Sequence, residues 1–241
     1  MLAEALTAGF WALVAASSLV VGALLSLTDW VRGRRLRLLI GFGAGALVSA
    51  VAYDLFAEAV RVSATGVSVA AGFVGGALVF YVGDEIIDRL PVAGGRPAAG
   101  GLAILFGAIL NGIPESVVLG LTLVGGGAPS LAVLVAIVVS NVPESIAAST
   151  SMRKAGRSQG WIVGIWTIVA LASAVAAAVG YSFLPGSSGE NVAFMNAFAA
   201  GAILVMLADE LIPEAHAERD KLVGLMTAAG FALAAFLSFS E

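Results

Sequence analysis

The segment at residues 42–59 (FGAGALVSAVAYDLFAEA) aligns without a gap with the segment at residues 198–215 (FAAGAILVMLADELIPEA). Both contain an Ala-Gly-Ala triplet, an acidic residue at Asp54 or Glu210, and a final Glu-Ala pair. Two shorter pairs keep nearly the same separation along the chain: residues 11–18 (WALVAASS) with 166–173 (WTIVALAS), and residues 71–73 with 229–231 (both AGF). These matches predict an internal repeat, although Ala- and Gly-rich membrane helices can also resemble one another through composition alone.

The composition is typical of an integral membrane protein. Of the 241 residues, 60% are hydrophobic and 12% are charged, which is more apolar surface than one soluble core can bury. Apolar stretches of about 20 residues fit a helix that crosses ~30 Å of hydrocarbon, whereas barrel strands would alternate in short segments. We therefore expect an all-α integral membrane protein with a single membrane domain over residues 1–241. The eight predicted transmembrane helices cover residues 5–28, 38–60, 63–83, 98–123, 131–152, 160–183, 191–214 and 222–240.

The basic residues lie on alternate connections between these helices. Eleven of the twelve lysines and arginines follow the first, third, fifth or seventh predicted helix, and only Arg61 lies elsewhere. Because cytoplasmic loops carry the excess of basic residues, this pattern predicts an even number of spans and both termini outside. A net charge of −4 argues against nucleic acid as a partner, and the absence of cysteine excludes disulfides and thiolate metal sites.

The repeat relates the first three helices, within residues 1–90, to the last three, within residues 160–241. Two central helices at residues 98–152 lie between them. Because repeat partners are five spans apart, they cross the membrane in opposite senses. This is the inverted-repeat plan of secondary carriers, which hold the substrate near the middle of the membrane.

The two central helices carry similar motifs, Asn111–Ser116 (NGIPES) and Asn141–Ser145 (NVPES). A carboxylate at bilayer depth is costly unless it is paired, so Glu115 and Glu144 are expected to face the bundle interior. Each glutamate follows a proline, which leaves the carbonyl four residues earlier without its helical donor. Helical spacing places Asn111 with Glu115, and both Ser140 and Asn141 with Glu144, on single faces. Free carbonyls and converging carboxylates predict a cation site, the alternative being two proline kinks whose protonated glutamates bond to neighbouring helices.

Further carboxylates lie toward the ends of the second and seventh helices. Asp54 and Glu58 are expected near the outer end, where they could collect cations. Their repeat equivalents, Glu210 and Glu214, are expected near the inner end, where they could receive them.

The two Pro-Glu-Ser segments, within eight predicted spans, resemble the ZIP (Zrt/Irt-like) family of divalent metal transporters. Its fourth helix typically reads His-Asn-x-Pro-Glu-Gly, and its fifth carries a similar Pro-Glu-Gly. The resemblance implies that Glu115 and Glu144 bridge the metal and that Asn111 replaces the usual histidine. It also implies polar ligands at Ser140 and Asn141, and a cytoplasmic-side relay at two residues that begin the seventh-helix motif, Asp209 and Glu210 (DELIPE).

The family resemblance also implies a 3+2+3 arrangement of helices and an elevator-like or rocking motion. The expected function is transport of a divalent metal, such as Zn, Mn, Fe or Cd, into the cytoplasm across a bacterial plasma membrane. The metal would be the substrate, with no fixed cofactor and no enzymatic activity. The expected partners are the metal ions and the lipid bilayer, and small-residue surfaces would permit a homodimer.

The predicted site departs from the family in its ligand chemistry. Imidazole suits zinc, whereas the amide, hydroxyl and carboxylate oxygens here favour harder cations such as Mn, Mg or Fe(II). The single histidine, His216, lies beyond the seventh helix. A second interpretation is therefore a protein of the same fold that transports another solute or senses rather than transports. An intramembrane enzyme is disfavoured, since the chain contains neither an H-E-x-x-H nor a G-x-S-x-G motif.

Replacing Asn111 of the predicted fourth helix tests whether this residue is a ligand in a metal path or whether the protein transports another solute or senses. The Asn111→His variant should gain affinity for zinc over manganese, because it restores the imidazole that zinc prefers. Competition binding to the purified protein measures the preference. An unchanged Zn-to-Mn ratio would argue against Asn111 as a ligand.

Overall fold

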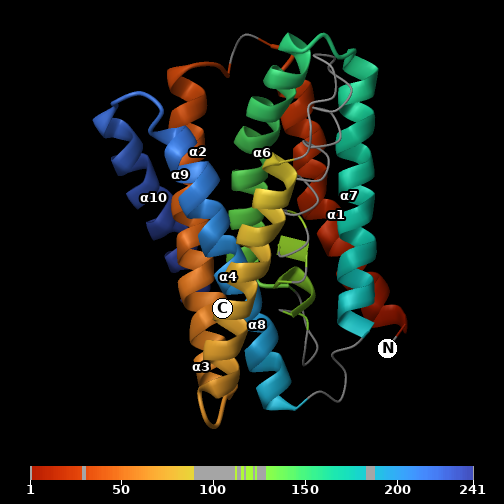
Figure 1. Ribbon diagram of the computed structural model, residues 1–241, viewed down its shortest axis with the longest axis vertical. Coiled ribbons are helices and arrows are strands. Elements are labelled where there is room, and N and C mark those ends of the chain that lie inside the picture. The colour runs from red at the N-terminus through yellow and green to blue at the C-terminus, as the bar shows by residue number, and fades with distance from the viewer. Residues whose placement is uncertain are drawn as a thin grey trace.

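The computed structural model describes residues 2–28, 31–89, 112, 115–116, 118–121, 123, 129–182 and 188–240. Across these residues the chain is an all-α bundle with seven helices long and apolar enough to span a membrane (Figure 1). This is the architecture of a multi-pass membrane protein. Its elements are α1 (Leu2–Leu25), α2 (Arg34–Ala50), η1 (Val51–Phe56), α3 (Ala57–Val62), α4 (Val67–Asp88), α6 (Leu131–Lys154), α7 (Gln159–Ser182), α8 (Gly189–Met206), η3 (Leu207–Leu211), α9 (Ile212–Ala215) and α10 (Lys221–Ser238).

Seven of the eight predicted spans are confirmed as helices, and most of the fourth, at residues 98–123, lies outside the described residues. The prediction that the third span covers residues 63–83 is wrong at both ends. Ser63 has an extended backbone and Gly66 a left-handed one with φ of 72°, so helix α4 begins at Val67. The Ser63 hydroxyl accepts a hydrogen bond from the Gly66 amide at 3.0 Å, which closes this turn. The helix then continues to Asp88. The predicted end at residue 83 marks where the charge-free stretch stops, but the acidic residues that follow remain helical.

The second and seventh spans each change from α- to π-helix partway along. The π-helical segments η1 and η3 begin at Val51 and Leu207, which are equivalent residues in the alignment of 42–59 with 198–215. Such segments are rare and often accompany functional sites. Here they carry Asp54 and Glu210, the equivalent acidic residues of the two segments. The similarity of these two sequences therefore extends to an uncommon backbone feature.

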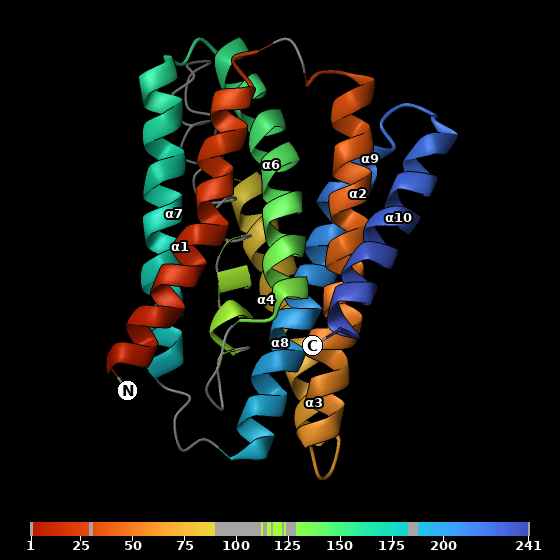
Figure 2. The same ribbon diagram turned by 180° about the vertical axis from the view of Figure 1, so that it is seen from behind.

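The helices predicted to be repeat partners run in opposite directions through the bundle. Figures 1 and 2 show α1 antiparallel to α7, α2 antiparallel to α8, and α4 antiparallel to α10. The closest helix packing is of α4 with α8, of α2 with α10, and of α1 with α7. Helix α6 lies between α1 and α2 and packs on both of them, so it joins two sets of helices. We group α6 with α1 and α7 as the first set, although it packs as extensively on α2, and α2, α3, α4, α8, α9 and α10 form the second set.

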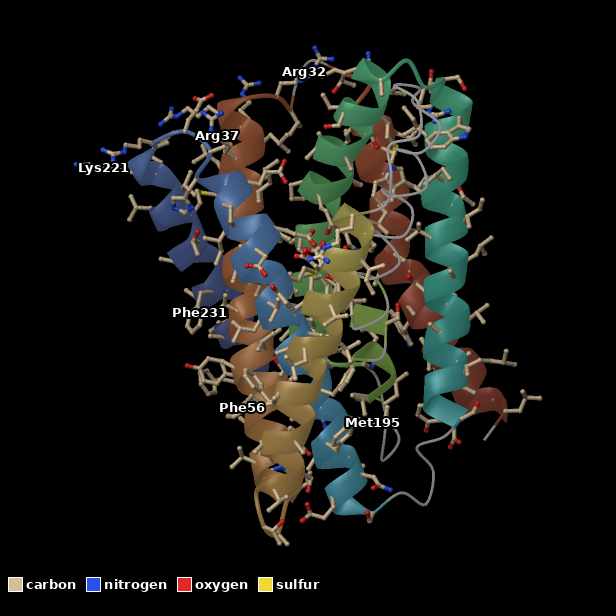
Figure 3. All side chains as sticks on the ribbon, viewed as in Figure 1. Arg32, Arg37, Phe56, Met195, Lys221 and Phe231 are labelled. Carbon is tan, nitrogen blue, oxygen red and sulfur yellow. The ribbon has the colours of Figure 1, made fainter. Side chains whose placement is uncertain are left out.

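Basic residues gather at one end of the bundle. Figure 3 shows Arg32, Arg37 and Lys221 at this end, which we call the basic end. Two ion pairs of 2.6 Å, Arg34–Asp220 and Arg37–Glu218, join the start of α2 to the loop before α10. The bond from Arg34 and a further hydrogen bond from the Leu222 amide hold the pKa of Asp220 below its usual value.

The opposite end has a matching connection made with different residues. Glu190, at the start of α8, occupies the position equivalent to Arg34 at the start of α2. Its carboxylate accepts hydrogen bonds from the Ser63 hydroxyl at 3.1 Å, the Ala64 amide at 2.6 Å, and the Ser68 hydroxyl. Each of these two helices is therefore tied at its first turn to the connection that precedes its packing partner.

Glycines let the paired helices approach closely. A Cβ atom at Gly45 in α2 would overlap the carbonyl oxygen of Thr227 in α10, and one at Gly230 would overlap that of Phe42. In the other pair, a Cβ atom at Gly201 in α8 would overlap the carbonyl oxygen of Phe73 in α4. Because lipid offers no strong hydrophobic drive for helix association, this close packing supplies much of the attraction between the helices.

An alanine at Gly45 should therefore destabilise the protein. The Gly45→Ala variant must push α2 away from α10, and we expect it to lose about 1–3 kcal/mol of unfolding free energy. The matched control is Gly224→Ala in α10, where an added Cβ meets no atom within 4 Å among the described residues. Thermal unfolding in detergent compares them, and equal melting temperatures would contradict the close packing.

Candidate metal site

Glycines of two other helices contact α6 just before its internal proline. A Cβ atom at Gly43 in α2 would lie 2.8 Å from the Cα of Ser140. On the other side, one at Gly22 in α1 would overlap the carbonyl oxygen of Val142. Pro143 removes the amide that would bond to the carbonyl four residues earlier, which weakens the helix at this point. The two close contacts fix the backbone where the predicted ligands of α6 begin.

The side chain of Glu115 is buried in the bundle interior. Only 4% of the residue is exposed, and its Oε1 atom has no hydrogen-bond partner among the described residues. The next residue, Ser116, is also buried, and its hydroxyl donates to the carbonyl of Gly112 at 2.5 Å. Glu115 and Ser116 lie in helical backbone, as the sequence predicted for this motif. A buried carboxylate oxygen without a donor is costly, so the site favours a proton or a cation.

A small cavity lies beside Glu115. Its volume is about 10 Å³, close to the smallest space that holds one water molecule. The walls come from α1, α6, α7 and the segment that contains Glu115. The lining residues are Ala12, Ala15, Ala16, Leu19, Gly112, Glu115, Ser116, Leu119, Ile137, Asn141 and Ser173. The cavity thus combines a carboxylate, an amide and two hydroxyls with a wall of small and apolar side chains.

Of the predicted ligands of α6, Asn141 lines this cavity, whereas Ser140 and Glu144 lie outside its lining. Asn141 is 3% exposed. Ser140 is fully buried, and its hydroxyl donates to the Ile137 carbonyl at 3.0 Å, which leaves the oxygen lone pairs able to accept or ligate. Glu144 is half-buried and interacts electrostatically with Glu115. The negative charges of the two central glutamates therefore act on each other.

The sequence-predicted residues outside α6 have different surroundings. Asn111 lies outside the described residues. Asp54 accepts hydrogen bonds from the Ser130 hydroxyl at 3.1 Å and the Ser238 hydroxyl at 2.7 Å. Glu58 forms a two-point ion pair with Arg61, with both N–O distances 2.6 Å. These partners position the carboxylates of Asp54 and Glu58, and neither residue is among the described residues that line the cavity.

Asp209 and Glu210 lie together on η3. Asp209 is exposed and Glu210 is half-buried. Neither residue lines the cavity beside Glu115. The structure therefore places Glu115 and Asn141 on one cavity. Ser140 and Glu144 lie nearby in α6, with Glu144 in electrostatic interaction with Glu115, and the carboxylates of η1 and η3 are not in the cavity lining.

Residues of α1 and α7 are the part of the site that the motif analysis did not include. Ser173 of α7 is 5% exposed and lines the cavity, as do three alanines of α1. These residues belong to segments 11–18 and 166–173, which had been aligned as repeat partners. Trp166 starts the second segment, and its indole N–H donates to the Ser149 hydroxyl at 2.8 Å, joining α7 to α6. The repeat signal could have identified these segments as the walls of the site.

The donor set is mixed rather than built from a cluster of charged or imidazole ligands. In the part of the chain that the structure describes, no three His, Cys, Asp or Glu residues form a group able to hold a metal. A site at Glu115 would rely on two carboxylates and neutral oxygen donors. Such donors suit hard cations better than they suit zinc.

Comparison with known proteins gives no family assignment. No protein-family model matches the chain, and no curated protein matches it either. The geometry of the site therefore carries the functional argument.

Removing the buried carboxylate should stabilise the metal-free protein. The Glu115→Met variant keeps a similar side-chain volume and removes an unsatisfied polar atom, so we expect a gain of about 1–3 kcal/mol in unfolding free energy. The matched control Glu190→Met should instead lose stability, because that carboxylate accepts three hydrogen bonds. Thermal unfolding with a chelator present measures both. A loss of stability in Glu115→Met would show that the carboxylate is satisfied in the empty protein.

Proposed function

We propose that the protein is a ZIP-like carrier that moves a divalent metal cation across the membrane through a site at Glu115 and Glu144. The supporting observation is the burial of Glu115, whose carboxylate has an unsatisfied oxygen beside a cavity of single-ion size. A divalent cation would compensate both glutamates at once. Asn141 and Ser140 would add neutral oxygens, and Asn111 would complete the site from the fourth helix.

The donor chemistry favours a broad range of metals. Carboxylate, amide and hydroxyl oxygens bind Mn and Fe(II) readily and bind Zn or Cd without the advantage of imidazole. The metal is the substrate, so it must leave as well as enter. A site with few charged ligands suits this purpose, because binding that is too tight would slow release.

The wider arrangement proposed is eight spans in a 3+2+3 inverted repeat, with both termini outside a bacterial plasma membrane. The antiparallel partners and the two equivalent π-helical segments support this arrangement. On this topology, Asp54 and Glu58 lie toward the outer side of the membrane and Asp209 and Glu210 toward the cytoplasm. These carboxylates would attract the cation at one side and receive it at the other.

The packing also supports a relative movement of two helix sets. The set of α1, α6 and α7 carries the described walls of the cavity, and it meets the larger set mainly where α6 packs on α2. Gly43 lies at this contact, and its lack of a side chain lets the backbones of α2 and α6 approach closely. An elevator-like or rocking movement along this contact would expose the site alternately to the two sides.

Metal binding should depend on pH. Ligating carboxylates must be deprotonated, so protons compete with the metal at Glu115 and Glu144. Affinity is therefore expected to fall as the pH is lowered, with protons released on binding.

Neutralising either glutamate should abolish metal binding. We expect Glu115→Gln and Glu144→Gln to weaken Mn²⁺ and Zn²⁺ binding by more than about 100-fold, since losing even an outer-shell partner costs 10–100-fold. The control Glu85→Gln removes a carboxylate that is paired with Arg89 outside the site, and it should retain binding. Titration calorimetry on purified protein measures affinity, and uptake into proteoliposomes measures transport. Equal binding by wild type and both glutamine variants would contradict the proposal.

A further inference from the structure

A second, larger cavity lies at the basic end of the bundle. Its volume is about 550 Å³, which is within the range of sites for small molecules. It opens between the start of α2, the last turns of α6, and α9. Three basic side chains line it, Arg32, Arg153 and Lys154, together with the hydroxyls of Thr150 and Ser151. Glu214 is the one acidic residue among the described residues of its lining.

The cavity lies at the level where the apolar spans end. The spans Arg34–Val62, Leu131–Lys154 and Gly189–Ala215 each have an end at or next to it. In a membrane, this level corresponds to the boundary between hydrocarbon and lipid headgroups. Basic residues at this boundary attract anionic headgroups.

Lys154 differs from several neighbouring basic residues in how it is engaged. Arg34 and Arg37 are paired with acidic residues, and the Arg157 guanidinium lies 4.6 Å from the centre of the Trp161 ring. In contrast, Lys154 forms no ion pair with any residue that the structure describes. The ammonium group of Lys154 therefore has donors to offer a ligand.

Arg153 is held in place without using most of its donors. Its Nη1 atom donates to the Ser26 carbonyl, just beyond the end of α1, at 2.6 Å. A guanidinium has five N–H donors, and they match the oxygens of a phosphate group. The bond to α1 orients this side chain at the cavity while the remaining donors can contact an anion.

We propose that this cavity binds a phosphate-bearing anion, with Arg32, Arg153 and Lys154 as its charged contacts and Thr150 and Ser151 as hydroxyl donors. The phosphate belongs either to the headgroup of an acidic phospholipid or to free inorganic phosphate. Glu214 would accept a hydrogen bond from a hydroxyl of a glycerol headgroup. This site is separate from the one at Glu115, and the inference does not depend on metal transport.

An anion bound here would link the two helix sets. Thr150, Ser151, Arg153 and Lys154 belong to α6, whereas Arg32 and Glu214 lie at the ends of α2 and α9. The anion would therefore contact both sets at one end of the bundle. It would favour the arrangement in which these helix ends are close together.

The first arm of the test uses phosphatidylglycerol and phosphatidylcholine in equal amounts. Full-length protein in a neutral detergent is analysed by native mass spectrometry, which counts the lipids retained. Wild type should retain phosphatidylglycerol preferentially. The Lys154→Gln and Arg32→Gln variants should each weaken retention about fivefold, the effect expected for one basic residue near anionic lipid. The matched control is Lys221→Gln, at the same end of the bundle but outside the cavity lining.

The second arm titrates inorganic phosphate into the same proteins by calorimetry. Preferential lipid retention that depends on Lys154 and Arg32, without phosphate binding, identifies a lipid site. Phosphate binding that depends on these residues, with equal retention of both lipids, identifies a site for the free anion. The proposal is overturned if both variants behave as wild type in both arms, or if Lys221→Gln loses as much binding as Lys154→Gln. Melting temperatures equal to that of wild type confirm that the variants are folded.

Discussion

Burying the Glu115 carboxylate between apolar helices costs several kcal/mol unless a proton, a cation or hydrogen bonds compensate it. The described structure supplies no hydrogen bond to one of its oxygens and places Glu144 close enough to interact with it. Two carboxylates in this setting disfavour each other's charge. The same burial that makes the empty site unfavourable gives a divalent cation a reason to occupy it. Glu115 therefore lowers the stability of the metal-free protein and favours binding of a cation.

The remainder of the bundle holds this unfavourable site in place. Glycines at the helix contacts allow backbones to approach, so the large set is formed by two closely packed pairs, α2 with α10 and α4 with α8. Helix α6 is closely contacted by Gly22 of α1 at Val142 and by Gly43 of α2 at Ser140, just before Pro143. A helix weakened by proline would otherwise bend freely. Here the contacts on both sides fix the direction in which its polar residues face.

Much of the fold could be predicted from the sequence, because apolar stretches and charged ends are local signals. Helices form at seven of the predicted spans, although α4 begins and ends later than hydropathy placed it, and the burial of Glu115 agrees with the expectation for a carboxylate at bilayer depth. The π-helical segments could not be predicted, since their residues have ordinary helical composition. Their equivalent starting points at Val51 and Leu207 nevertheless follow the alignment that the sequence suggested.

The surroundings of Asp54 and Glu58 were only partly predictable. Glu58 and Arg61 are three residues apart on a helix, so their ion pair could have been anticipated. Asp54 instead bonds to Ser130 and Ser238, which are distant in the sequence and meet only through packing. The cavity between Arg32 and Lys154 arises in the same way. The basic pattern predicted that these residues share one end of the bundle, but not that they line one space.

The proposed transport requires one divalent cation to rest between Glu115 and Glu144. Anomalous X-ray diffraction from crystals grown with Mn²⁺ locates the metal directly, without relying on altered side chains. The account predicts a single strong anomalous peak inside the bundle, within coordination distance of a carboxylate oxygen from each glutamate and close to Asn141. Manganese found only at the carboxylates of η1 or η3, or no peak between the two central glutamates, would contradict it.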